Sequence, residues 1–299
     1  MDNLKNHPLY QNHTIDTAIS SLFDFYKNNF AKLFAMSLIM AAVLQYAITS
    51  VFDIASLQNE TDITVLMEKM GEMMTPILIL ALVNILFSII IQHYILVNPL
   101  HEDSSILNSI LGSFRYFFPY LIAIILFSII GGIAIALGLV AFIIGAIFAI
   151  IYVITLILFI LPIMIIEGPN ISHVIGRTFK MAHKNFWTNY AWVIVFVTLF
   201  LLISFIISGL ILAPFAGNFL SSIFSSDGAA NFTEITQKPM YIILSVIASA
   251  ITMPLMPLFS TILYLNCRAK EEPDENEEKK ITVEDLYAKP YSENYSDNM

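Results

Sequence analysis

The sequence predicts an all-α, polytopic membrane protein with six transmembrane helices, and three observations support this fold class. Apolar residues make up 58% of the 299 residues and charged residues only 12%, whereas about 25% of the residues in an ordinary soluble domain are charged. The mean hydropathy of the chain is +0.77. Lysine and arginine are concentrated in alternate connecting segments. A water-soluble core of this size cannot bury so much apolar surface, so lipid must surround part of the chain.

The six spans follow from the length of the apolar stretches, because a helix needs about 20 apolar residues to cross the hydrocarbon layer. Residues 116–166 include no charged residue over 51 positions. This stretch suits two crossings joined by a tight turn, which we place near Gly138. Pro254 and Pro257 interrupt the last span. The expected spans are residues 33–52, 76–97, 117–137, 140–166, 187–211 and 240–267.

The distribution of lysine and arginine predicts the orientation. With the N-terminus inside, the cytoplasmic segments hold twelve of these residues, and the outer loops hold only Lys69 and Lys238. Basic residues near span ends tend to remain on the cytoplasmic side. We therefore expect a multi-pass protein of the cytoplasmic (inner) membrane with both termini in the cytoplasm.

The membrane domain, residues 33–267, is expected to lie between two cytoplasmic segments. Residues 1–32 include an amphipathic helix, and residues 268–299 hold ten acidic and five basic residues. A composition of this kind predicts a disordered tail, which could bind a membrane-protein partner. No basic domain remains that could bind nucleic acid. The single cysteine, Cys267, and the spacing of the histidines indicate no metal and no other cofactor.

Each cytoplasmic segment shows the same order of an amphipathic helix, a basic residue, aromatic residues and then a span. Apolar residues recur at helical spacing ahead of Lys27, Arg115 and Lys184, as expected for helices that lie flat on a membrane. The sequence therefore predicts three copies of a unit that consists of one surface helix and two spans. The alternative is three unrelated amphipathic linkers.

The third surface helix carries a row of bases on the face opposite its apolar stripe. The members of the row, spaced by four, three and four residues, are His173, Arg177, Lys180 and Lys184. A base near anionic lipid headgroups contributes about 1 kcal/mol to membrane binding. We interpret the lysines and arginine of this row, with Arg115 and Lys27, as candidate contacts with anionic headgroups. The alternative is that they reflect only the positive-inside bias.

Glu167 is the only acidic residue that borders the apolar run, and it lies ten residues before Arg177. An unpaired charge near hydrocarbon is costly, so this carboxylate is expected to have a basic partner. One interpretation is a gate or a headgroup site. The other is an ion pair between Glu167 and Arg177 that fixes the third surface helix to the fourth span.

Gln45 and Asn84 are a candidate intramembrane polar pair. They lie at similar depth in the first and second spans, roughly 12–14 Å from the outer ends at about 1.5 Å per residue. Amides of this kind usually form hydrogen bonds between helices in a membrane. The alternative is that they form the polar lining of a substrate path.

Three short runs resemble a known bacterial group: LPIMIIEG at 161–168, VIGRTFK at 174–180 and KNFW at 184–187. They are similar to a signature of uncharacterised six-span proteins related to the membrane domain of glycerophosphoryl diester phosphodiesterases. The resemblance is sharp over about 161–190 and general elsewhere. It implies the six-span class and a link to membrane or lipid biology. It does not imply phosphodiesterase activity, because the segment after residue 267 is too short and too polar for the soluble catalytic domain.

The sequence shows no nucleophile elbow, phosphate-binding glycine loop or dinucleotide fingerprint. We therefore expect a non-enzymatic integral membrane protein that acts on lipids or on other membrane proteins through its basic surface helices. One alternative is a carrier or channel for a small or lipidic solute, which requires a cavity that reaches Gln45 and Asn84. A further alternative is a membrane-embedded lipid enzyme.

Overall fold

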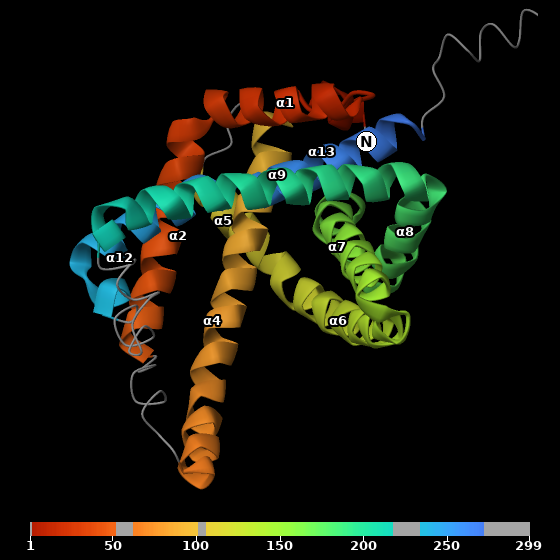
Figure 1. The fold of residues 1–299 in the computed structure, drawn as a ribbon. Helices are drawn as coiled ribbons and strands as arrows, with labels where there is room; N and C mark the ends of the chain where they lie inside the picture. The colour runs from red at the N-terminus through yellow and green to blue at the C-terminus, as the bar shows by residue number, and fades with distance from the viewer. Residues whose placement is uncertain (1, 52–61, 101–105, 218–233, 272–299) are drawn as a thin grey trace, which may run out of the picture.

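The computed structural model describes residues 2–51, 62–100, 106–217 and 234–271, and helices account for nearly all of them (Figure 1). The α-helices are α1 (Ile15–Asn28), α2 (Phe30–Val51), α4 (Ile63–Val97), α5 (Ile106–Ser113), α6 (Phe117–Val140), α7 (Phe142–Glu167), α8 (Ile171–Lys184), α9 (Phe186–Leu212), α12 (Pro239–Thr252) and α13 (Leu255–Ala269). Short 3-10 helices cover Asp2–Asn6, Asn98–Leu100, Phe114–Tyr116 and Ala213–Phe215.

Six stretches of the described chain are long and apolar enough to cross a membrane. They are Phe30–Thr49, Ile63–Leu100, Ile106–Val140, Phe142–Glu167, Phe186–Phe215 and Pro239–Ala269. Four of the predicted spans fall within one of these stretches, and the other two, 33–52 and 140–166, overlap one of them over most of their length. The all-α polytopic fold is therefore confirmed. In Figure 1, α9 runs across the view whereas α4 runs from top to bottom, so the apolar helices cross one another and are not all parallel.

The turn between α6 and α7 differs from the expected one. Helix α6 continues through Gly138 to Val140, and Ala141 alone separates it from α7. The residue with positive φ is Phe142, at 63°. Gly138 acts by its small size: a Cβ atom at this position would lie 2.6 Å from the carbonyl oxygen of Gly145. The glycine therefore allows the two helices to approach closely beside the turn.

The sixth span is broken where the sequence predicts. Helix α12 ends at Thr252 and α13 begins at Leu255, with Pro254 in the break. A proline ring displaces the preceding turn of a helix and removes one backbone donor. The two halves have different partners: α12 packs on α2 and α9, whereas α13 packs mainly on α7, α4 and α1.

Three short helices, α1, α5 and α8, each precede a pair of long apolar segments, in the expected order. That they are copies of one unit remains a prediction. That α8 lies flat on the membrane also remains a prediction; in the structure it packs along the α6–α7 hairpin. Phe179 stacks on Phe127 of α6, and His183 contacts Tyr152 of α7, each with ring centroids less than 6 Å apart. The hairpin therefore covers the apolar face of α8, and this contact removes apolar surface of α8 from water.

Segments that the sequence assigns to the cytoplasmic side lie close together. The His7 ring Nε2 donates to the carbonyl oxygen of Ile95, 3.0 Å away, at the end of α4. The backbone N–H of His13 donates to Asn266 Oδ1 of α13 at 2.9 Å. Tyr116 donates from its hydroxyl to the Ile165 carbonyl oxygen at 3.3 Å. The N-terminal segment therefore joins the ends of two apolar helices that are distant in sequence.

Candidate functional site

The candidate site forms where the C-terminal ends of α7 and α13 meet α8. Gly168 follows α7 with φ of 110°, a conformation that favours glycine. Asn170 then caps α8, because its Oδ1 accepts the backbone N–H of His173 at 3.1 Å. This short turn directs α8 back past the end of α7 and places its first two turns beside Glu167.

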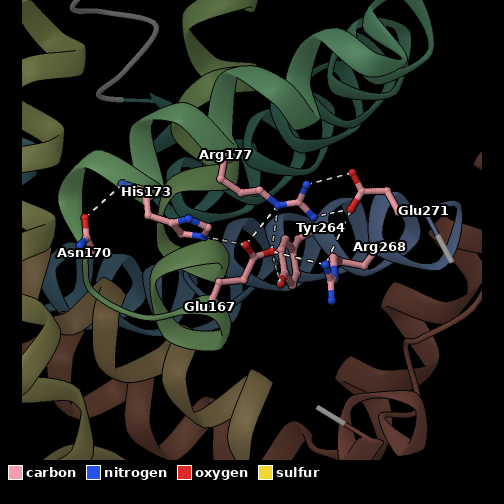
Figure 2. Close-up of polar contacts among 7 residues, drawn as sticks. All are labelled: Glu167, Asn170, His173, Arg177, Tyr264, Arg268 and Glu271. Atoms are coloured by element: carbon pink, nitrogen blue, oxygen red, sulfur yellow. Dashed lines mark hydrogen bonds and ion pairs between the residues drawn. The ribbon is translucent and has the colours of Figure 1, made fainter.

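Glu167 is the centre of the site, and its side chain is only 7% exposed. Arg177 Nε lies 3.1 Å from both carboxylate oxygens, and the ring of His173 approaches to 3.0 Å. Tyr264 of α13 donates its hydroxyl to Oε1 at 3.1 Å, and the Arg268 guanidinium lies 3.9 Å away. Figure 2 shows these groups converging from three helices. A buried carboxylate requires such partners to offset its desolvation.

Glu271 supplies a second carboxylate, just beyond α13. Its oxygens accept from both terminal nitrogens of Arg177, with the Nη1–Oε1 distance at 3.0 Å (Figure 2). Arg268 lies 3.8 Å and Lys184 Nζ 4.0 Å from the same carboxylate. Burial alone would raise the pKa of Glu271, but the hydrogen bonds and charge of Arg177 hold it below its usual range.

Arg177 is held between the two carboxylates. Burial opposes its charged form, but the hydrogen bonds and charges of Glu271 and Glu167 raise its pKa above the usual value. The guanidinium therefore remains charged at any physiological pH. It links α8 to the ends of both α7 and α13 and has little capacity left for another anion.

An open pocket of about 530 Å³ lies over this network. Its lining residues are Glu167, His173, Arg177, Lys180, Lys184, Arg268 and Glu271. Among the described residues, four bases and two carboxylates give the lining a net charge of +2 when His173 is neutral. Lys180 has no ion-pair partner in the part of the chain that the structure describes, and Lys184 is 47% exposed. The two lysines are therefore the groups able to receive an anion.

The pocket brings together Glu167, Arg177, Lys180 and Lys184, four of the predicted candidates. The ion pair between the first two of them, one of the two interpretations of the sequence, is present. The other two candidate headgroup contacts lie elsewhere. Arg115 donates to the hydroxyl of its neighbour Tyr116 and covers that ring at 4.6 Å, and Lys27 is exposed at the end of α1.

Three members of the site, Tyr264, Arg268 and Glu271, were not predicted. The expected tail boundary at residue 268 divided this group, although α13 continues to Ala269 and Glu271 is bound to Arg177. Glu271 was assigned to the acidic tail, because composition does not identify an ion-pair partner that is distant in sequence. Residues 272–299, with the expected tail and its possible partner, lie outside the described residues.

Gln45 and Asn84 line one hollow of about 310 Å³ between α2, α4, α9 and the α12–α13 break. The expected hydrogen bond between them is absent. Neither carboxamide hydrogen-bonds to another group among the described residues.

The chain was compared with protein-family models, with curated proteins and with solved structures, and no match was found in any of the three comparisons.

Proposed function

We propose that this integral membrane protein binds the phosphate of anionic phospholipids in the cytoplasmic leaflet through the pocket between α8 and α13. The observation that carries the proposal is the arrangement of charge in the pocket. Arg177 is neutralised by two carboxylates, whereas Lys180 and Lys184 remain exposed at the opening. A lysine ammonium is a point charge on a flexible stem and suits a phosphate that approaches from the bilayer surface.

The network below the lysines acts as their scaffold. Arg177 connects Glu167 on α7 to Glu271 after α13, so the three elements keep a fixed relation to one another. A site with preformed geometry loses less conformational entropy on binding. The charged face of α8 must remain in water or among headgroups, because moving it into hydrocarbon is costly. In this proposal the α6–α7 hairpin that carries α8 is therefore inclined to the bilayer normal.

The test is a lipid titration of the purified full-length chain, with bound lipids counted by native mass spectrometry. We expect phosphatidylglycerol to bind more tightly than phosphatidylcholine. The Lys180→Gln/Lys184→Gln variant is expected to lose about thirtyfold of this preference, since each of the two bases contributes about 1 kcal/mol. The matched control is Lys69→Gln/Lys238→Gln, which removes the same charge from the segments that the sequence assigns to the outer side.

Equal binding of the two lipids by the unaltered protein contradicts the proposal. An equal loss in both double variants also contradicts it, because the preference would then come from net charge and not from the pocket.

A further inference from the structure

The second hollow, between α2, α4, α9 and the α12–α13 break, has a different chemistry from the charged pocket. Its lining residues are Ala41, Leu44, Gln45, Ile48, Asn84, Phe200, Ser249, Thr252, Met253 and Met256. Most of the lining is apolar, and none of the described residues that contribute to it is charged. Polar groups come from two carboxamides and two hydroxyls. An occupant must therefore be mainly apolar, with a small polar group.

The two carboxamides are the observation that points to an occupant. Gln45 is half-buried and Asn84 is exposed toward the hollow and the adjacent groove. The backbone carbonyl oxygens of these two residues accept from the hydroxyls of Thr49 and Ser88 at 3.0 Å each, and no described residue hydrogen-bonds to either carboxamide. A polar group in an apolar medium without a hydrogen bond is destabilising by roughly 1–3 kcal/mol. Both carboxamides are thus available to a bound molecule.

The hollow has an opening toward the lipid. A neighbouring groove of about 460 Å³ between α2 and α4 shares Leu44, Ile48 and Asn84 with it. Ile48 and Ala81 on this groove are exposed, and both helices belong to candidate spans. The groove therefore faces the hydrocarbon layer, where the molecules available to enter are lipids.

We infer that the hollow binds one acyl chain of a diacylglycerol, a neutral ester lipid that has no charged headgroup to keep it at the bilayer surface, with an ester carbonyl accepting hydrogen bonds from the carboxamides of Gln45 and Asn84. The chain enters through the groove between α2 and α4 and lies against Leu44, Ile48 and Phe200. The break in the sixth span opens the hollow, because α12 and α13 diverge at Pro254. This site binds a chain and an ester, so it does not depend on the headgroup charge that the pocket on α8 recognises.

The experiment uses the full-length chain in phosphatidylcholine nanodiscs that contain a diacylglycerol with a diazirine on one acyl chain. After irradiation, labelled peptides are located by mass spectrometry. We expect labelling to concentrate on residues 41–48 and 249–256. The Gln45→Leu/Asn84→Leu variant, which keeps a similar volume, is expected to reduce that labelling about tenfold, since each lost hydrogen bond weakens binding by roughly three- to tenfold.

The matched control is Thr49→Val/Ser88→Ala, one turn away on the same two helices and outside the hollow. Its labelling is expected to equal that of the unaltered protein. Ser249→Leu is a second variant that narrows the hollow and leaves both carboxamides in place, and it is expected to give a similar loss. Two results would overturn the inference. One is labelling of residues 41–48 and 249–256 that is no greater than labelling of the exposed Ile129 and Ile133 of α6. The other is equal labelling of the carboxamide variant and the unaltered protein. Because the probe lipid is neutral, this result is independent of the test with Lys180 and Lys184.

Discussion

Arg177 on α8 and Glu167 at the end of α7 form an ion pair in which Nε lies 3.1 Å from both carboxylate oxygens, with side chains only 10% and 7% exposed. The pair is completed by α13, since Tyr264 and Arg268 approach the same carboxylate. One acidic side chain on α7 therefore contacts groups from both α8 and α13, and it lines the charged pocket at their junction.

Replacement of Glu167 by glutamine is expected to destabilise the junction. The change leaves Arg177 and Arg268 with one carboxylate between them, and an uncompensated charge in a poorly solvated site is costly. We expect the free energy of unfolding to fall by about 2 kcal/mol, measured as a lower unfolding temperature in detergent micelles.

The matched control is Glu234→Gln. Glu234 pairs with Lys238 at 3.3 Å but is 71% exposed, so this change is expected to cost less than about 0.5 kcal/mol. If the two variants unfold at the same temperature, the junction is not held by Glu167.

The α6–α7 turn gives a prediction about glycine. Gly138→Ala places a methyl group 2.6 Å from the Gly145 carbonyl oxygen, which is backbone and cannot move aside. We expect the hairpin to separate and the unfolding temperature to fall by several degrees. Gly132→Ala on the same helix meets no atom within 4 Å, and alanine favours helix, so this control is expected to be neutral or slightly stabilising. Equal unfolding temperatures for the two variants would show that the close contact has no energetic role.

Attachment of the N-terminal segment is expected to weaken in acid. Burial lowers the pKa of both His7 and His13 below 6.5, although hydrogen bonds to carbonyl oxygens act in the opposite direction. The folded segment therefore prefers neutral rings, whereas the unfolded segment binds protons once the pH falls below about 6.5. The stabilisation is complete above that pH and is lost below it, by at most about 1.4 kcal/mol per histidine for each pH unit.

Hydrogen exchange of residues 4–13 measures this effect. After correction for the intrinsic rate, protection is expected to be lower at pH 5.5 than at pH 7.5. In the His7→Gln/His13→Gln variant the difference is expected to disappear. Equal corrected protection of the unaltered protein at both values would contradict the assignment of neutral rings.

The fold class and the position of every apolar helix could be predicted from the sequence, because hydropathy over about 20 residues is a local property. The break at Pro254 and the pair of Glu167 with Arg177 were also predictable, since proline acts locally and an acid at a hydrocarbon boundary requires a base. The packing of α8 on the α6–α7 hairpin was not predictable, because an amphipathic face does not indicate whether lipid or a helical hairpin covers it. Glu271 was missed because its partner, Arg177, lies 94 residues away.

The proposed function depends most on the basic face of α8 lying on the opposite side of the membrane from the N-terminal half of α4. Single cysteines at Lys180 and at Met67, which is 71% exposed, can be introduced into a Cys267→Ser background and labelled with a membrane-impermeant maleimide. We predict that Lys180→Cys reacts only when the cytoplasmic face is accessible and that Met67→Cys reacts in intact cells. Reaction of both positions from the same side would contradict the topology and, with it, a headgroup site in the cytoplasmic leaflet.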